Sequence, residues 1–571
     1  MIDFKPKIIS ALKNYDKKTF SADLMAGIIV GIVALPLAIA FGIASGVTPE
    51  KGIITAIIGG FIISLLGGSS VQIGGPTGAF IIIIYGIIQQ YGEKGLLLAT
   101  LLAGVILLVM GIFKLGTIIK FIPYPIIIGF TSGIAVTIFT TQIADVFGLS
   151  FGDDKVPGDF IGRWIMYFKH FTSINWWETL ISFLSIGLII ITPRFSKKIP
   201  GSLVAIVLVT ILVYILKTWL GITGIDTIGD RFTISATLPD AEIPKLDYES
   251  VKSLIPVSIT IAVLGAVESL LSATVADGVI GQKHNSNTEL IAQGAANIVV
   301  PLFGGIPATG AIARTMTNIN NGGKTPIAGI IHAIILLFIM LFLMPLAKYI
   351  PMACLAGVLV IVAYNMSEWR TFKAFMNNPK SDVAVLLVTF FLTVIFDLVI
   401  AIQVGLVLAF LLFMKRVTET SEVSVIRDQL NIFGGTDIKD DENLEIPKGV
   451  EVYEIEGPYF FGVANKFEEQ TIIMGEPPKV RIIRMRKVPF IDSTGIHNLT
   501  NFCKNSQRDK ITIILSGVNK DVHETLEKAG FYDVVGRENI CSHIVEALNR
   551  SKEVLSTIEE TKAIKKKKTK E

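Results

Sequence analysis

Long apolar runs separated by short polar turns fill the chain up to about residue 418. Most runs hold the roughly 20 residues that an α-helix needs to cross a hydrocarbon layer, so the pattern predicts about fourteen membrane spans. Runs 77–91 and 310–319 are too short to cross alone, and we expect each to cross as an extended strand followed by a half helix. The predicted spans are 23–46, 53–70, 77–91, 96–116, 122–147, 174–193, 201–221, 254–278, 288–303, 310–319, 325–346, 351–366, 382–397 and 399–416.

Two interruptions of this pattern nearly repeat one another, IGGPTGAF at residues 73–80 and FGGIPATGAI at residues 303–312. Corresponding breaks in two halves of a membrane chain are typical of a central binding site, and two helix starts meeting there favour an anion. Tight helix packing through glycine is the alternative, but packing does not require a proline in both copies. The residues predicted to form the site are Thr77, Gly78, Ala79, Gly310, Ala311 and Ile312.

The repeat divides the spans into two halves of about seven, and an odd number per half inverts the second half relative to the first. Lysines precede the first span, and basic residues recur in alternate turns, whereas the loop over 222–253 is acidic. The positive-inside rule therefore predicts that both termini are cytoplasmic. The expected location is a bacterial-type inner membrane. The first span lacks a signal-peptide cleavage site and should be retained.

Two charged residues fall inside predicted spans, Glu268 in the eighth and Arg314 in the half helix that begins near Gly310. A charge there costs about 3 kcal/mol or more, so such residues usually face a partner or a cavity. Arg314 would add fixed positive charge to the anion site, and Glu268 could take up and release a proton during transport. Alternatively the two residues pair with each other only to hold the halves together, although buried pairs add little stability.

Two further features of the sequence need interpretation, the pair Pro36 and Phe41 in the first span and the turn over 322–325. Pro36 is the positional counterpart of Glu268 in the first half, where it either shapes the site or only kinks the helix, and Phe41 could line the pocket. The turn over 322–325, GGKT, looks like the end of a P-loop. It lacks the required preceding glycine and strand, so nucleotide binding there is not expected.

Residues beyond about 419 have the composition of an ordinary soluble domain. Alternating strands and helices predict a small α/β domain. Asp492, Ser493 and Thr494 precede a glycine and either cap a helix or form a regulatory phosphorylation or docking site. The strands are expected at 450–455, 480–485 and 511–515, and the helices at 464–474, 492–504, 521–528 and 540–550.

Composition excludes several classes of function. The net charge of +3 gives no reason to expect a nucleic-acid partner. The three cysteines lack metal-ligand spacing, and no catalytic constellation is visible, so no metal, cofactor or enzymatic activity is expected. The basic stretch over 565–568 is interpreted as a solvated tail, with contact to anionic lipid as the alternative.

Taken together, the two broken stretches, Pro36 with Phe41, the Glu268–Ser272 segment ESLLS and the turn over 322–325 resemble the SulP family of anion transporters. The soluble domain, with its Asp492 motif, resembles a STAS domain. The resemblance implies a seven-plus-seven inverted repeat of the UraA type, an elevator motion and a homodimer. It further implies a small inorganic or organic anion as substrate, such as sulfate, bicarbonate, chloride, oxalate or a dicarboxylate.

The resemblance also implies roles for individual residues. The substrate would lie between the two helix starts, with Phe41 in the pocket and Arg314 beside the anion. Glu268 and Ser272 would serve in coupling, and the Asp492 motif in regulation. Sodium-coupled bicarbonate members are expected to have an aspartate at the Glu268 position and a hydroxyl near Ile312, so this chain favours protons over sodium.

The predicted function is proton-coupled symport of sulfate or a dicarboxylate. The alternatives are sodium-dependent bicarbonate uptake, a signalling or scaffolding role through a cytoplasmic partner of the STAS domain, and nucleobase transport on the same architecture. The predicted organisation is a cytoplasmic segment 1–20, a transport domain 21–418, a linker 419–445, a cytoplasmic STAS domain 446–555 and a basic tail 556–571.

Overall fold

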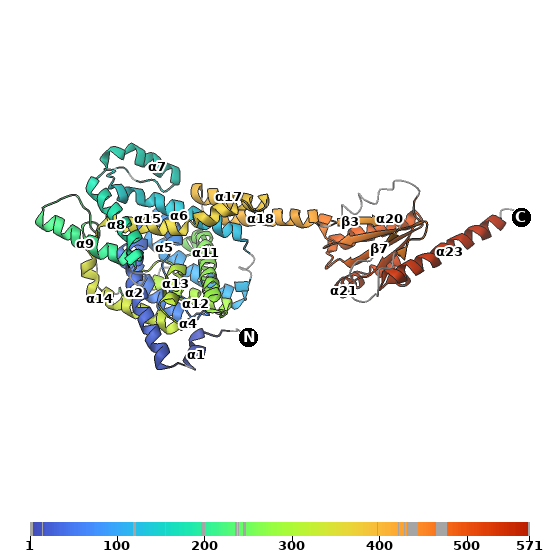
Figure 1. Cartoon of the computed structure of the whole chain (residues 1–571), viewed down its shortest axis with the longest axis horizontal. Coiled ribbons are helices and arrows are strands. Elements are labelled where there is room, and N and C mark those ends of the chain that lie inside the picture. The colour runs from blue at the N-terminus through green and yellow to red at the C-terminus, as the bar shows by residue number, and fades with distance from the viewer. Residues whose placement is uncertain are drawn as a thin grey trace. The chain divides into compact units, whose positions relative to one another are not determined.

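The computed structural model divides into two compact units, Met1–Ala409 and Phe410–Glu571, and each is described by itself (Figure 1). The helix predicted over 464–474 lies outside the described residues. The structure describes residues 4–13, 15–117, 122–152, 154, 156–195, 200–233, 237, 239–243, 247–396, 398–420, 422–426, 429–430, 444–463 and 477–568.

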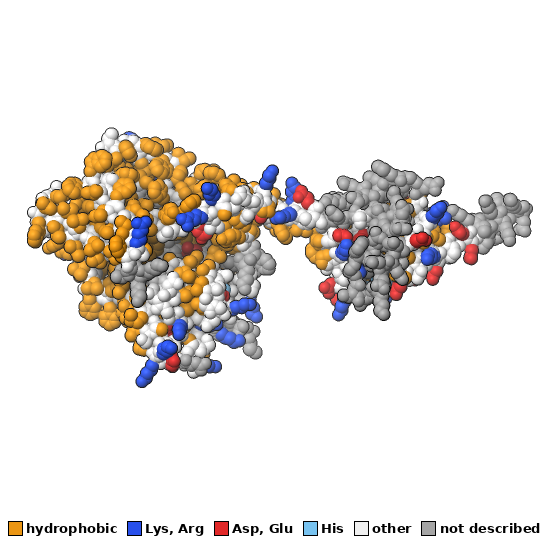
Figure 2. All heavy atoms as spheres, in the orientation of Figure 1, with side chains coloured by type: hydrophobic (Ala, Val, Ile, Leu, Met, Phe, Trp, Pro, Cys, Tyr) orange, Lys and Arg blue, Asp and Glu red, His pale blue; other side chains and the backbone are white. Residues whose placement is uncertain are grey.

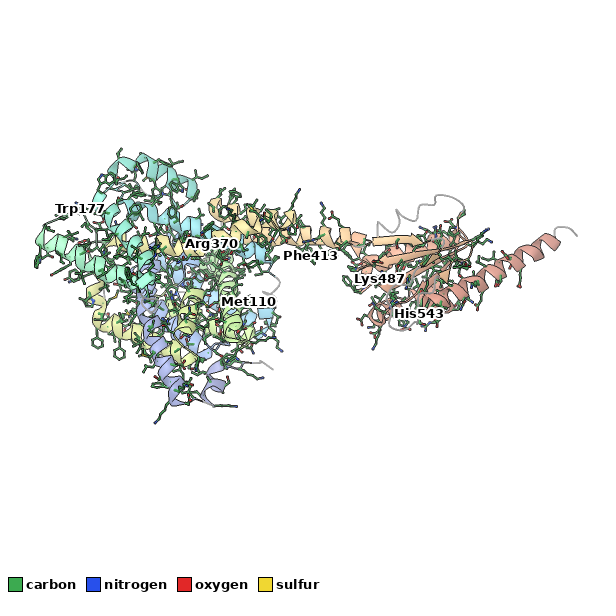
Figure 3. All side chains as sticks on the ribbon, viewed as in Figure 1. Met110, Trp177, Arg370, Phe413, Lys487 and His543 are labelled. Carbon is green, nitrogen blue, oxygen red and sulfur yellow. The ribbon has the colours of Figure 1, made fainter. Side chains whose placement is uncertain are left out.

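The first unit is helical, as the apolar runs predict. Hydrophobic side chains cover much of the face seen in Figure 2, as expected of a surface that meets lipid. Trp177, near the start of α8, lies at the margin of the unit in Figure 3, and tryptophans favour membrane interfaces. The helices are α1 (Lys7–Leu12), α2 (Lys17–Ala44), α3 (Pro49–Ile54), α4 (Gly60–Leu66), α5 (Ile81–Ile112), α6 (Tyr124–Phe147), α7 (Phe160–Lys169), α8 (Trp176–Phe195), α9 (Gly201–Trp219), α10 (Ile228–Arg231), α11 (Tyr248–Ile280), α12 (Ser286–Val299), α13 (Ile312–Asn320), α14 (Pro326–Ala347), α15 (Met352–Met366), α16 (Trp369–Phe375), α17 (Lys380–Ile395) and α18 (Leu398–Thr420).

Ten helical segments in the described ranges are long and apolar enough to cross a membrane. Helices α12, α13 and α17 have 14, 9 and 16 residues, too few for that criterion, so the count of about fourteen spans stays a prediction. Helix α5 continues past Gly92, whose φ of 68° marks the break between the predicted spans 77–91 and 96–116.

Some helices extend beyond their predicted bounds because polar residues cap them. Helix α2 begins at Lys17 rather than residue 23, since the side chain of Asp16 accepts a hydrogen bond from the Thr19 amide at 2.7 Å. Helix α11 likewise begins at Tyr248, where the Asp247 side chain accepts from the Ser250 amide at 3.0 Å. Capping by a side-chain oxygen satisfies amides that a helix start leaves free.

The GGKT turn binds a carboxylate of the chain itself. Asp23 of α2 is fully buried, and it accepts hydrogen bonds from the amides of Lys324 and Thr325 at 2.7 and 3.2 Å. The hydroxyls of Thr325 and Tyr15 also donate to it, at 2.5 and 3.1 Å. Four donors thus satisfy one buried charge, which joins the start of α2 to the start of α14.

The second unit is a five-stranded sheet with helices. The strand order is β3-β6-β7-β8-β9, with β3 antiparallel to β6 and the other neighbours parallel. Alternate residues of β6 and β7 pack on opposite faces of the sheet, because successive side chains of a strand point to opposite sides. Its elements are β3 (Glu422–Ile426), β4 (Gln429–Leu430), β5 (Leu444–Glu445), β6 (Val450–Glu456), β7 (Val480–Lys487), α20 (Ser493–Arg508), β8 (Thr512–Ser516), α21 (Lys520–Lys528), α22 (Tyr532–Val535), β9 (Ile540–Cys541) and α23 (Ile544–Lys568).

The structure differs from three expectations for this unit. The last helix begins at Ile544 rather than residue 540, because Ile540 and Cys541 pair with β8 as an edge strand. That helix then continues to Lys568, through most of the segment interpreted as a tail. Strand β3 falls inside the predicted linker, where the sequence gives no alternation long enough to predict it.

Cys503, which lies on α20, should resist alkylation in the native protein. The thiol is buried, and burial raises its pKa to about 12. The reactive species is the thiolate, so at pH 8 iodoacetamide should label Cys503 about a thousandfold more slowly than a free thiol of pKa about 8.5. Mass spectrometry of tryptic peptides, with urea-unfolded protein as the control, measures this. Rapid stoichiometric labelling of the folded protein would contradict it.

Candidate functional site

The two broken stretches meet in the first unit. Strands β1 (Gly74–Gly75) and β2 (Thr309–Gly310) are antiparallel, with Gly74 opposite Gly310 and Gly75 opposite Thr309. The pairing is extended by the Ala311 amide, which donates to the Ile73 carbonyl at 2.9 Å. Backbone that would be unsatisfied in a bilayer is therefore paired between the two halves of the chain.

A helix starts directly after each strand. Thr77 precedes a 3₁₀ turn over Gly78–Phe80 that leads into α5, and Ala311 precedes α13. The first amides of a helix have no partner within it, and they carry the positive end of its dipole. Both helix starts lie within three residues of one short ladder, which concentrates these donors in one place.

Arg314 joins the two stretches. Its side chain is 2% exposed, and its guanidinium donates from Nη2 to the carbonyl of Pro76. The other terminal nitrogen, Nη1, is buried and has no hydrogen-bond partner among the described residues. Because an isolated buried donor is costly, an unsatisfied guanidinium nitrogen at this place is suited to an anionic ligand.

Glu268 of α11 contacts Thr77, the residue after Pro76. Its Oε2 accepts a hydrogen bond from the Thr77 hydroxyl at 2.7 Å, and its side chain is partly exposed. Across the described residues the structure records no ion pair between Glu268 and Arg314. The two charges are instead linked through Thr77 and Pro76, and a purely structural role for both stays the alternative to the predicted one.

An apolar wall closes one side of this arrangement. A Cβ on Gly78 would lie 3.1 Å from Ile138 Cδ1, 3.2 Å from Met366 Sδ and 3.5 Å from Phe41 Cε1. Phe41 is buried in α2, whereas Ile138 and Met366 come from α6 and α15. Helix α5 thus begins against side chains from three other helices.

The remaining predicted site residues are distributed unevenly. Ala79 and Ala311 are buried, whereas Ile312, the first residue of α13, is 41% exposed. The Ser272 hydroxyl donates to the Thr315 hydroxyl at 3.3 Å, so it braces α13 rather than touching Glu268. The structure brings most of the predicted residues together, and their roles in binding and coupling stay predictions.

A buried polar network behind the ladder was not predicted. Glu289 of α12 is fully buried and accepts from the amides of Gly68 and Ser69 at 2.9 and 3.3 Å. Gln293 Nε2 donates to Glu289 at 2.9 Å and to the Ser269 hydroxyl at 2.7 Å. The network holds α11 and α12 against the segment that leads into β1.

Gln72 and Asn297 complete that network. Gln72 Nε2 donates to the Ser269 hydroxyl at 2.7 Å. The Asn297 side chain bonds both the amide and the carbonyl of Ala308, each at 2.8 Å, which fixes the chain just before β2. Polar residues at i and i+4 inside the predicted apolar span 288–303 were the available sequence signal, since such residues usually face a bundle interior.

Gly75→Ala should disrupt the site without unfolding the unit. Gly75 has a φ of +151°, and an added Cβ would lie 2.2 Å from Arg314 Nη1. The clash displaces the guanidinium, so we expect at least about a tenfold loss of anion flux, equivalent to about 1.4 kcal/mol. The matched control is Gly86→Ala on α5, where a Cβ meets nothing within 4 Å. Flux in proteoliposomes measures both, and equal flux in the two variants would contradict the expectation.

The Asp492 motif of the second unit caps a helix. Asp492 Oδ1 accepts from the Gly495 amide at 2.6 Å, and Oδ2 accepts from the Phe461 amide at 3.3 Å. Ser493 and Thr494 are exposed in the first turn of α20. The geometry of Asp492 therefore matches the capping alternative, and a regulatory role for the motif stays a prediction. Throughout the described ranges, no group of three His, Cys, Asp or Glu side chains could hold a metal ion.

Comparison with known proteins gives the family. The sequence profile of the sulfate permease family matches residues 20–389, and that of the STAS domain matches residues 442–547. YvdB of Bacillus subtilis, named for sulfate transport, is 39% identical over 533 residues, which cover 93% of this chain and 98% of YvdB. The bicarbonate transporter BicA of Picosynechococcus is 28% identical over 546 residues, or 94% of this chain and 95% of BicA.

Solved structures agree with that fold. The murine Slc26a9 anion transporter in its inward-facing state superposes with a TM-score of 0.84 at 19% identity, covering 95% of this chain and 93% of that one. The transmembrane domain of a cyanobacterial BicA superposes with a TM-score of 0.60 at 30% identity, covering 69% of this chain and 98% of that domain. The predicted fold class, a helical membrane domain followed by a STAS domain, is confirmed. This chain belongs to the sulfate permease family.

Proposed function

We propose that this protein is a secondary active transporter that takes up sulfate or a dicarboxylate together with protons. The observation that carries the proposal is the buried Arg314, which braces the paired strands and keeps one donor free beside two helix starts. Two unit charges 4 Å apart attract by about 4 kcal/mol at an effective dielectric constant of 20. Such a site attracts anions of several shapes, and it explains selectivity for charge.

Coupling to protons is assigned to Glu268. Its carboxylate accepts the Thr77 hydroxyl at the start of α5, so it lies next to the proposed anion site without being paired to Arg314. Protonation of Glu268 would remove a negative charge from that site and favour the anion. Proton and anion would therefore bind together, which is the requirement for symport.

Bicarbonate is the second candidate substrate, because the BicA relatives match nearly the whole chain. The local residues favour it less, since Ile312 offers no oxygen for a sodium ion near the helix start. Sodium-dependent bicarbonate uptake predicts that flux disappears when potassium replaces sodium.

The wider proposal is a homodimer in the inner membrane with cytoplasmic termini and an elevator-type movement of the site. The ladder supports the elevator, because strands from both halves and the starts of α5 and α13 are joined by hydrogen bonds and would move as one piece. The proposal also includes a protein partner for the STAS-like unit. Ser493 and Thr494 are exposed there and are therefore accessible to modification.

Proteoliposome uptake tests the function. Protein is reconstituted with an inward proton gradient, and labelled sulfate, succinate, oxalate, bicarbonate and uracil are offered in turn, with and without sodium. Accumulation of sulfate or succinate that collapses with a protonophore supports the proposal. Accumulation that depends only on sodium would replace protons by sodium, uracil uptake would indicate a nucleobase carrier, and no accumulation of any anion would refute the proposal.

A further inference from the structure

Two of the cavities in the described part of the first unit lie beside α5 and α6. The larger, of about 360 Å³, is lined by α5, α6, α7, α11 and α17. The smaller, of about 180 Å³, is lined by α2, α5, α6, α7 and α15. Tyr85, Thr141 and Arg163 line both cavities and therefore stand where they meet. A water molecule takes about 30 Å³ in the liquid, so the larger cavity has room for an oxyanion with part of its hydration shell.

Arg163 is the unusual member of this set. It belongs to α7, a short helix at the margin of the unit in Figure 1, yet its side chain is only 7% exposed. Its guanidinium carbon lies 4.6 Å from the centre of the Tyr85 ring, and its Nε donates to the Pro157 carbonyl at 2.9 Å. A cation on a loop helix has no need to be buried, because it could extend into water at no cost.

No carboxylate neutralises Arg163 within the described part of the chain. Asp159, beside it in the larger cavity, caps α7 by accepting from the Gly162 amide at 2.6 Å. Asp145, in the smaller cavity, forms an ion pair with Arg231 at 2.7 Å. The positive charge of Arg163 therefore remains available in a pocket that Thr137, Thr140 and Thr141 also line, with their hydroxyls donating to backbone carbonyls of α6.

The cavities lead toward the ladder from one side. The larger cavity reaches Ile81, the first residue of α5 and three residues after Gly78. Tyr85 lies about 6 Å further along α5, and Thr260 lies about 12 Å before Glu268 on α11. The smaller cavity reaches Ala40, the neighbour of Phe41. Phe41, Ile138 and Met366 lie against Gly78, at the start of the 3₁₀ turn that leads into α5. Under the predicted orientation α7 follows the fifth span and faces outward.

We propose that Arg163, where the two cavities meet, forms an outer binding site for the transported oxyanion, occupied before the anion reaches the two helix starts. The guanidinium holds the anion by charge, while Tyr85 and the Pro157 carbonyl fix the orientation of the guanidinium. A positive group in a partly dry cleft raises the local anion concentration and the rate of capture. The site rests on the proposed anion transport, but its occupancy can be measured independently.

Anomalous scattering from selenate, a heavy analogue of sulfate, tests occupancy in crystals of the full-length protein. A peak beside Arg163 is expected in the wild type and in Lys169→Gln, and is expected to vanish in Arg163→Gln. Lys169 is the matched control, because it is an exposed cation on the same helix whose ion pair is with Asp154. A peak beside Arg314 but none beside Arg163 would refute only the outer site. Peaks at neither place would refute the proposed function as well.

Directional flux gives a second readout. Arg163→Gln should raise the KM for sulfate offered from the α7 face about tenfold, with Vmax and the KM from the opposite face unchanged. Arg163→Lys keeps the charge and should give an intermediate KM, which separates loss of binding from loss of folding. Equal KM changes from both faces would overturn the proposal.

Discussion

Arg314→Gln is expected to reduce Vmax/KM for anion uptake by at least about a hundredfold. The substitution removes the positive charge beside the helix starts, whose attraction to an anion at 4 Å is about 4 kcal/mol, equivalent to roughly a thousandfold. Glutamine also cannot reach Pro76 in the geometry of a guanidinium, so the carbonyl loses its donor. Initial rates of sulfate uptake in proteoliposomes measure the effect.

Two variants control this experiment. Lys324→Gln removes the same charge from an exposed position in the turn that follows α13, and should leave uptake within about twofold because surface charges interact weakly with distant sites. Arg314→Lys retains the charge without the planar fork and should recover part of the uptake. If Arg314→Gln folds normally and transports at the wild-type rate, Arg314 is not part of the anion site.

Glu268→Gln is expected to abolish accumulation driven by a proton gradient while exchange of anions across the membrane continues. The amide resembles the protonated carboxyl in size, and its oxygen can still accept the Thr77 hydroxyl. It cannot lose a proton, so the return step without substrate is no longer coupled to pH. The ratio of internal to external anion should fall from well above one to about one.

Counterflow distinguishes uncoupling from damage to the site. Preloaded vesicles should exchange labelled for unlabelled anion within about threefold of the wild-type rate, since binding by Arg314 and the helix starts is retained. A matched variant, Glu93→Gln, removes a carboxylate that pairs with Lys51 at a more exposed position and should leave accumulation unchanged. Concentrative uptake by Glu268→Gln would contradict the assignment of coupling to this residue.

The sequence was most informative where a local pattern had only one physical solution. Apolar runs of this length form helices in a bilayer, and Pro/Gly breaks there need protein or a wet cavity to satisfy their backbone. The sequence therefore predicts that residues 73–80 and 303–312 meet, and the structure adds that they pair as β1 and β2. Arg314 and Glu268 stood out for the same reason, because charge inside a span is expensive. The STAS-like strands followed from ordinary alternation of apolar residues.

The sequence was least informative where partners are far apart along the chain. Asp23 looked like a boundary residue, and only the structure shows that it caps a turn 302 residues later. Glu289 stands 221 residues from the amide of Gly68 that it accepts. Edge strand β9 is only two residues long. Arg163 lies on a helix within a loop, and its side chain packs on the ring of Tyr85, 78 residues earlier. No local period encodes such pairings.

The bond from Arg314 to Pro76 joins residues 238 positions apart. At a synthesis rate of about 5 to 20 residues per second, the ribosome needs roughly 10 to 50 s to deliver the second partner after the first. During that interval the newly inserted first half carries glycine-rich backbone whose partners have not yet been made. Insertion machinery or lipid headgroups must shelter it until then, which makes slow elongation or early truncation a hazard specific to this fold.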